Sequence, residues 1–200
     1  MTEHAPRSPD DVRSFLRDWI HLANAGQWQR FGALLHPAIV LDDPMMSEPA
    51  QGREQALLRA QAQYEPFPDG RIEMVGAPLV SVDAPELAYR WRFVGTHLRP
   101  IDPPGFAPTG LPLMIEGTSV LHFQDGRVDH VRLFFDTTDV ARQLLAAPPA
   151  GSPLERVIAL SQRVRVRLRR RPVQPHLRSE PHRGRVRRRS RDLRVATTRR

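Results

Sequence analysis

The sequence predicts an α+β protein in which helices lie on one face of a curved β-sheet. Helical periodicity dominates the first third of the chain, whereas residues 71–135 consist mainly of runs rich in β-branched and aromatic residues. Helices that precede consecutive, turn-linked strands favour α+β over an alternating α/β fold. The chain of 200 residues is long enough for one domain with a substantial core and an additional terminal segment.

The first two helices follow from capping signals and apolar spacing. Ser8 is a favourable N-cap, Pro9 suits the first helical position, and apolar residues recur every three or four positions until Gly26. A second, short helix is expected over residues 28–35, because the residue before Pro37 is disfavoured in the helical conformation.

The rest of the predicted domain is one further helix, the strands of the sheet and a closing helix. We expect a strand over residues 39–42, a helix over 52–63, strands over 71–82, 87–97, 113–123 and 127–135, and a helix over 138–147. Gln124-Asp125-Gly126, between the last two strands, is a hairpin signal.

Charge separates the predicted domain from the end of the chain. Residues 151–200 hold 17 of the 30 basic residues and only three acids, a net charge of +14, which leaves −6 for residues 1–150. We therefore predict a flexible N-terminus at 1–7, a domain at 8–147, a linker and basic amphipathic helix at 148–170, and a disordered Arg-rich tail at 171–200. Non-specific contact with polyanions through residues 151–200 is expected.

Composition also limits the cofactors and the cellular location. The chain has no Cys, which excludes disulfides and thiolate metal sites, and its eight His show no metal-ligand spacing. We therefore expect no metal and no cofactor. No apolar run is long enough for a membrane span and no apolar signal core follows Met1, so the sequence predicts a cytoplasmic protein without a transmembrane segment.

Two groups of motifs resemble a known superfamily. Residues 39–44 (Ile-Val-Leu-Asp-Asp-Pro) and 52–55 (Gly-Arg-Glu-Gln) are similar to ketosteroid isomerases, where such a strand end leads to such a helix start. Residues 95–97, 108–110 and 122–128 stand in the order found in SnoaL-like polyketide cyclases. The resemblance, to the nuclear transport factor 2-like superfamily, implies a cone-shaped curved antiparallel sheet wrapped around N-terminal helices, the cystatin-like or ketosteroid isomerase-like roll, and a homodimer.

The resemblance also assigns candidate site residues. Asp43 falls at the general-base position of the isomerases, Trp19 at that of their hydrogen-bonding Tyr, and Ser119 at that of their protonated Asp. The acid/base pair of the cyclases falls at Leu133 and Ser119, so that pair is absent. We expect Asp43 to be the catalytic base in a pocket, with Trp19 and Ser119 holding a substrate oxygen. A turn-capping role before Pro44 is the alternative for Asp43, and simple core packing on the apolar side of the first helix is the alternative for Trp19.

Alternation along the strands predicts the remaining pocket wall. Tyr89, Trp91 and Phe93 share one face of their strand, and Val131, Leu133 and Phe135 share one face of the last strand. Either stripe can line a pocket for an apolar ligand or simply form core. We expect His97 near the pocket mouth as a titrating partner for Asp43, the alternative being a structural hydrogen bond.

These residues predict a cofactor-independent isomerase or polyketide cyclase that acts on a hydrophobic, carbonyl-containing small molecule of steroid-like or polyketide-like character. Two alternatives stay open from the sequence. The first is a non-catalytic ligand-binding or dimeric assembly module of the same fold, because the partner residues of both enzyme families are replaced. The second is polyanion binding through the Arg-rich tail.

Overall fold

The computed structural model describes residue 6, residues 8–102 and residues 105–168. The predicted flexible N-terminus, apart from residue 6, and the predicted Arg-rich tail at 171–200 lie outside the described residues. Contacts divide the chain into two units, of which the first ends at Val157. The first unit holds the sheet and every cavity residue discussed below.

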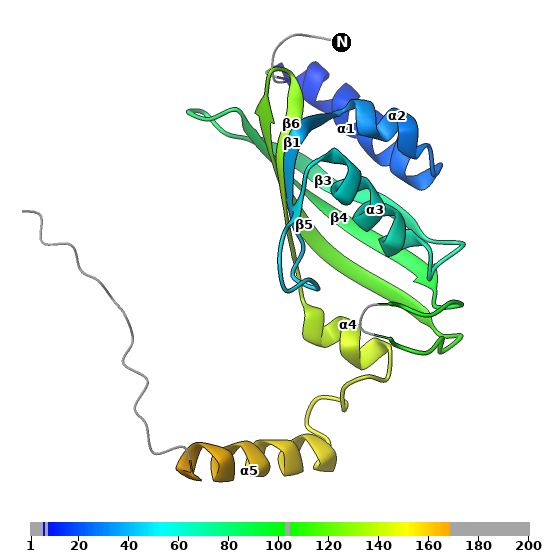
Figure 1. Cartoon of the computed structure of the whole chain (residues 1–200), viewed down its shortest axis with the longest axis vertical. Helices are drawn as coiled ribbons and strands as arrows, with labels where there is room; N and C mark the ends of the chain where they lie inside the picture. The colour runs from blue at the N-terminus through cyan, green and yellow to red at the C-terminus, as the bar shows by residue number, and fades with distance from the viewer. Residues whose placement is uncertain (1–5, 7, 103–104, 169–200) are drawn as a thin grey trace, which may run out of the picture. The chain divides into compact units, whose positions relative to one another are not determined.

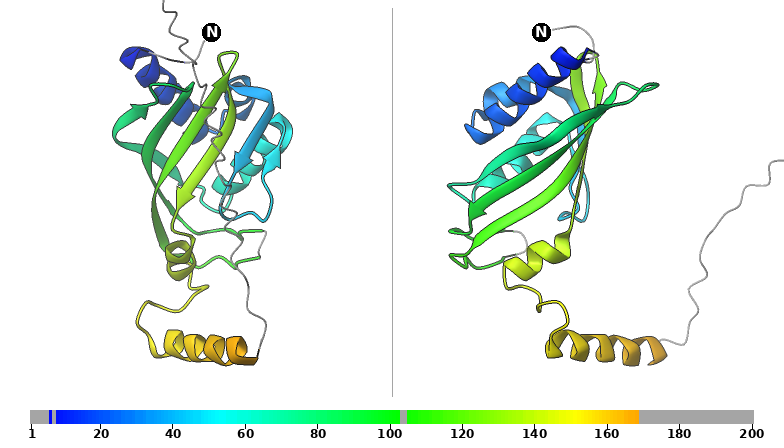
Figure 2. Two further views of the ribbon diagram at one scale, coloured as in Figure 1. Left: turned by 90° about the vertical axis from the view of Figure 1, so that its left-hand side faces the viewer. Right: turned by 180° about the vertical axis from the view of Figure 1, so that it is seen from behind.

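The first unit is a six-stranded sheet with three helices on one face (Figures 1 and 2). The strands are β1 (Leu35–Asp42), β2 (Ala50–Gln51), β3 (Arg71–Val80), β4 (Glu86–Thr96), β5 (Pro112–Gln124) and β6 (Arg127–Phe135), in the order β2-β1-β6-β5-β4-β3. The pairs are antiparallel except β1 with β6, which is parallel. The predicted α+β class with a curved sheet around N-terminal helices is confirmed.

Within the described ranges, three helices precede or interrupt the strands and two follow them. They are α1 (Pro9–Asn24), α2 (Trp28–Ala33), α3 (Arg53–Tyr64), α4 (Thr137–Gln143) and α5 (Pro153–Leu168). The side chain of Ser8 caps α1 by accepting a hydrogen bond from the amide of Asp11. At the other end of α1, Asn24 exchanges two hydrogen bonds of 2.8 Å with the backbone of Ile72, which attaches the helix to β3.

The start of β1 differs from the prediction. The strand begins at Leu35 rather than at residue 39, and α2 ends at Ala33, because the backbone of Leu35 finds partners outside a helix. Leu35 pairs with Val128 of β6, and its carbonyl accepts hydrogen bonds from the Arg53 guanidinium at 3.1 and 2.6 Å. The β1–β6 register then shifts before Val40. Pro37 lies in this stretch, where its missing N–H interrupts the ladder.

The sequence Gly52-Arg53 fixes the start of α3 on β1. Gly52 has a φ of 82°, a conformation that residues with a Cβ rarely adopt, and its amide donates to the carbonyl of Ile39 at 2.7 Å. Arg53 holds Leu35 as described above. The two contacts bring α3 against β1, so that one face of α3 is directed toward the inner face of the sheet.

The inner face of the sheet carries the core and the outer face carries charge. Along β4, the side chains of Tyr89, Trp91 and Phe93 are buried, whereas Arg92 forms an outer-face ion pair with Glu116 of β5. Among the described residues, no helix is long and apolar enough to cross a membrane.

Candidate functional site

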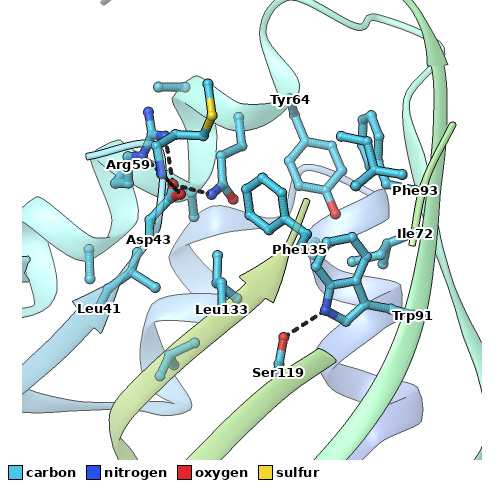
Figure 3. Close-up of a pocket in the computed structure, with 18 of the residues that line it drawn as sticks. Leu41, Asp43, Arg59, Tyr64, Ile72, Trp91, Phe93, Ser119, Leu133 and Phe135 are labelled. Carbon is cyan, nitrogen blue, oxygen red and sulfur yellow. Dashed lines mark hydrogen bonds and ion pairs between the residues drawn. The ribbon is translucent and has the colours of Figure 1, made fainter. Parts of the chain in front are cut away.

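A cavity of about 190 Å³ lies between helices α1–α3 and the inner face of the sheet (Figure 3). Its walls are mainly aliphatic and aromatic side chains, and its polar lining side chains are those of Asp43, Arg59, Gln63, Tyr64, Tyr89, Ser119 and the indoles of Trp19, Trp28 and Trp91. A cavity with apolar walls and a few polar groups is typical of small-molecule sites. The cavity is therefore the candidate functional site.

Asp43 lies in the wall of this cavity with no exposed side-chain area. Its Oδ2 accepts hydrogen bonds from Arg59 Nε and Gln63 Nε2, each at 2.8 Å, and forms an ion pair with Arg59 Nη2 at 2.6 Å (Figure 3). Its Oδ1 accepts one, from the amide of Met45 at 2.9 Å. The carboxylate is thus held by fixed donors, and Oδ1 keeps unused acceptor capacity.

Both sequence-based interpretations of Asp43 describe part of its environment. The bond from the Met45 amide to Oδ1, and the bond from the Met46 amide to the Asp43 carbonyl at 2.9 Å, are those of an Asp that begins a turn. The same side chain also faces the cavity. Turn capping therefore orients the carboxylate without removing it from the pocket.

Helix α3 supplies the partners of Asp43, and sequence reasoning missed them. Arg59 and Gln63 are four residues apart and share one face of α3, together with Ala56. All three line the cavity. The available signal was this spacing in the helix that follows the Asp-Pro turn. The same four-residue spacing of Arg59 and Gln63 is equally typical of a solvated helix face, because Arg and Gln are usually exposed.

The indole groups of two tryptophans bind other side chains of the cavity wall. Trp19 Nε1 donates to the Tyr89 hydroxyl at 3.0 Å, and Trp91 Nε1 donates to Ser119 Oγ at 2.9 Å. Burial raises the pKa of Tyr89, and its hydrogen bonds with Ser119 and Trp19 oppose that rise. Trp19 and Ser119 therefore lie in the predicted pocket, and each already takes part in a hydrogen bond within the protein.

Tyr64, the last residue of α3, is a third polar residue that sequence reasoning missed. Its ring makes edge contacts with Trp28 and Phe93, at centroid distances of 5.4 and 5.7 Å. Burial, and to a smaller extent Tyr89, raises the pKa of the Tyr64 hydroxyl. No pattern in the sequence marks this residue, because it adjoins the end of a helix and precedes a turn.

The predicted apolar wall lies in the cavity. Phe93, Val131, Leu133 and Phe135 line it along with Tyr89 and Trp91. Trp91 and Phe135 are in edge contact, with ring centroids 6.0 Å apart.

His97 lies away from the cavity wall. Its side chain is fully buried against Phe67, and its Nδ1 lies 3.3 Å from the Thr109 hydroxyl and 3.3 Å from the Thr109 amide. Its Nε2 has no partner among the described residues. Burial lowers the pKa of His97. These contacts are those of the structural alternative, and His97 is not among the residues that line the cavity.

Asp42, the neighbour of Asp43, points to the opposite face of β1. Its Oδ2 binds His130 Nε2 at 2.9 Å and Arg132 Nε at 3.1 Å, both on β6. The hydrogen bond with His130 is the main cause that lowers the pKa of Asp42. The two adjacent carboxylates therefore have different surroundings, which makes Asp42 a matched control for Asp43.

Within the described part of the chain, no group of three or more His, Cys, Asp or Glu side chains is placed to hold a metal ion. The cavity offers proton-transfer and hydrogen-bonding groups: one carboxylate, one guanidinium, one amide, hydroxyls and indoles. Such a set can bind an apolar molecule, orient an oxygen atom of that molecule, and exchange a proton with it.

The fold and cavity define the class of cone-shaped α+β domains that enclose an apolar pocket, and comparisons with known proteins identify the family. The family model for SnoaL-like polyketide cyclases matches residues 11–144. The chain belongs to the SnoaL-like polyketide cyclase family, as the sequence resemblance predicted. A search of curated proteins found no match.

Solved structures share this fold. The candidate SnoaL-like polyketide cyclase from Jannaschia sp. CCS1 superposes with a TM-score of 0.60 and 23% identity, covering 72% of this chain and 98% of its own. TsrD from Streptomyces laurentii superposes with a TM-score of 0.59 and 18% identity, covering 70% and 99%. AclR, a candidate hydroxylase from Streptomyces galilaeus, superposes with a TM-score of 0.58 and 18% identity, covering 82% of this chain and 100% of its own. At these identities the likeness supports the fold alone.

Proposed function

We propose that this protein is a cofactor-independent cyclase or isomerase in which Asp43 is the general base and the substrate is a hydrophobic, carbonyl-containing small molecule. One observation carries the proposal. Among the residues that line the cavity in the described part of the chain, Asp43 is the only carboxylate, and the remaining wall is mainly apolar. Family membership supports the same class of reaction.

The proposed reaction begins at a carbon next to the substrate carbonyl. Asp43 takes the proton from this carbon, and the electron pair of the broken C–H bond forms an enolate whose charge lies mainly on oxygen. Return of the proton to another carbon gives isomerisation. Attack of the enolate carbon on a second carbonyl carbon of the same molecule, with the proton delivered to the new alkoxide, closes a ring. Both routes balance without an oxidant or a reductant.

The partners of Asp43 give this proposal a defined geometry. Arg59, Gln63 and the Met45 amide hold the carboxylate in one orientation, so no reorganisation is needed before proton transfer. Oδ2 already accepts two hydrogen bonds and pairs with Arg59 Nη2, whereas Oδ1 accepts one hydrogen bond. Oδ1 is therefore the oxygen that we assign to the proton transfer.

Proton exchange at carbon tests the proposal without knowledge of the natural substrate. The protein is incubated in D₂O with a small aromatic methyl ketone, 2-acetylnaphthalene, and loss of the methyl proton signal is followed by NMR. We expect protein-dependent exchange that falls by roughly 100-fold or more in Asp43→Asn, the size of a general-base contribution. Asp42→Asn, at the last position of β1 and on its outer face, should leave the rate unchanged.

A second candidate function is the binding of a hydrophobic ligand without turnover. The specific observation in its favour is that the two polar groups expected to hold a substrate oxygen already bind other protein groups: Trp19 binds Tyr89, and Ser119 binds Trp91. This function predicts saturable binding of the ketone with no protein-dependent exchange. Native mass spectrometry of the intact complex would then show the unmodified ligand.

A further inference from the structure

The Tyr64 hydroxyl is a polar group that the hydrogen bonds of the cavity leave unused. Figure 3 shows the ring of Tyr64 extending from α3, with its oxygen directed into the cavity on the side of Trp91 and Ile72. None of the described residues forms a hydrogen bond with this oxygen, whereas the edge contacts with Trp28 and Phe93 hold the ring in place. The hydroxyl is thus both oriented and available.

Four other polar side chains of the wall contrast with Tyr64. The indole N–H groups of Trp19 and Trp91 donate to Tyr89 and Ser119. The donors of Arg59 and Gln63 are directed to Asp43. A ligand oxygen that recruited one of these donors would have to compete with an existing bond, whereas the Tyr64 O–H is free to donate.

The protonation state of Tyr64 suits donation of its O–H to an acceptor rather than an ion pair with a cation. Burial raises the pKa of the phenol above its ordinary value, so the O–H stays protonated at neutral pH. A neutral phenol donates one hydrogen bond to a carbonyl oxygen. A carbonyl oxygen of a ligand in the cavity would give this O–H an acceptor.

The size of the cavity limits the ligand that this hydroxyl can meet. A cavity of about 150 Å³ lined by apolar side chains holds a molecule the size of benzene. The present cavity of about 190 Å³ therefore suits a planar body of one or two rings better than a four-ring steroid.

We infer that Tyr64 is a specificity-determining residue that donates a hydrogen bond to the carbonyl oxygen of a planar ligand of one or two rings. This inference rests on the proposed function for the choice of a hydrophobic carbonyl compound. A site built to hydrogen bond one oxygen discriminates against an analogue without it, because the protein hydroxyl is then left unpaired. Tyr64 selects the ligand and orients its carbonyl, while Asp43 acts at the adjacent carbon.

A matched pair of ligands isolates this hydrogen bond. 2-Acetylnaphthalene and 2-ethylnaphthalene differ by the carbonyl oxygen, and their affinities are measured by isothermal titration calorimetry with the full chain. The native protein should prefer the ketone. Tyr64→Phe removes only the hydroxyl and should weaken ketone binding by roughly 3- to 10-fold, the net value of one hydrogen bond, while hydrocarbon binding changes by less than about twofold.

Infrared spectroscopy supplies a readout that a purely structural role of Tyr64 would not move. The carbonyl stretch of the bound ketone should lie at a lower frequency in the native protein than in Tyr64→Phe. Tyr89→Phe is the comparison variant, because the Tyr89 hydroxyl is the acceptor of Trp19. Tyr89→Phe should lower the stability of the fold and change the affinities for the ketone and the hydrocarbon to the same extent.

Two results would overturn the inference. The first is a native protein that binds the ketone and the hydrocarbon with the same affinity; the second is a Tyr64→Phe variant whose affinity for both ligands falls by the same factor. The proposed base is judged by a different measurement. If Asp43→Asn exchanged protons at the native rate while Tyr64→Phe lost its preference for the ketone, the base assignment would fail and the Tyr64 assignment would stand.

Discussion

Replacing Arg59 by methionine removes its hydrogen bond and ion pair with Asp43 and leaves a carboxylate with no exposed area facing an apolar side chain. Loss of one partner of a buried ion pair costs about 3–5 kcal/mol. The Arg59 side chain is 14% exposed, and Gln63 and the Met45 amide still donate to Asp43, so we expect the lower end of this range, about 3 kcal/mol. In a chain of this size the loss corresponds to a decrease in Tm of roughly 6–12 °C.

Urea denaturation of a double-mutant cycle measures the prediction. Arg59→Met, Asp43→Asn and the double variant are compared, and the double variant should be at least about 1 kcal/mol more stable than the sum of the single effects predicts. Arg132→Met is the matched control, because Arg132 is 54% exposed and pairs with Asp42 on the outer face. It should cost no more than about 1 kcal/mol. Additive single effects, or a loss in Arg59→Met no larger than in Arg132→Met, would refute the reasoning.

Three further predictions concern packing, pH and assembly. A Cβ at Gly117 would overlap the Trp91 ring and come within 2.7 Å of the Phe134 carbonyl, so Gly117→Ala should destabilise the fold by about 1–3 kcal/mol in urea denaturation; an unchanged midpoint would contradict this packing. Because burial lowers the pKa of His97, this side chain binds a proton in the unfolded chain below a pH of about 6.5, whereas in the folded protein it does so only at lower pH. The unfolding free energy should therefore decrease with falling pH in that window, and His97→Asn should flatten the slope; equal slopes would exclude His97 as the cause. The family resemblance predicts a homodimer; light scattering should give twice the chain mass, and Phe134→Asp on the exposed outer face should yield monomers, whereas a native monomer at all concentrations would contradict the prediction.

The order and type of the main elements could be predicted from the sequence because local signals and tertiary structure agree there. Ser8 caps α1 as its position before Pro9 predicted, and the last strand spans residues 127–135 as predicted. The start of β1 could not be predicted, because it depends on a strand partner and on the side chain of Arg53, both distant in sequence.

The site was predictable in outline and not in its hydrogen bonds. Motif order predicted that Asp43 lies in the cavity. Strand alternation, which backbone geometry enforces, predicted the same for the aromatic stripe of β4. The Arg59 and Tyr64 assignments depend on the rotation of α3 about its axis and on individual rotamers. No local pattern fixes either one: the spacing of Arg59 and Gln63 also fits a solvated helix face, and no pattern marks the Tyr at the helix end.

The identity of the group that removes the proton is the central claim of the proposed function. The most direct measurement is the ratio of methyl proton exchange rates of 2-acetylnaphthalene in D₂O, Asp43→Asn over native, with Asp42→Asn measured in parallel. The proposed mechanism predicts a ratio of about 0.01 or less for Asp43→Asn and a ratio near unity for Asp42→Asn. Equal ratios for the two variants would contradict the assignment of Asp43 as the base.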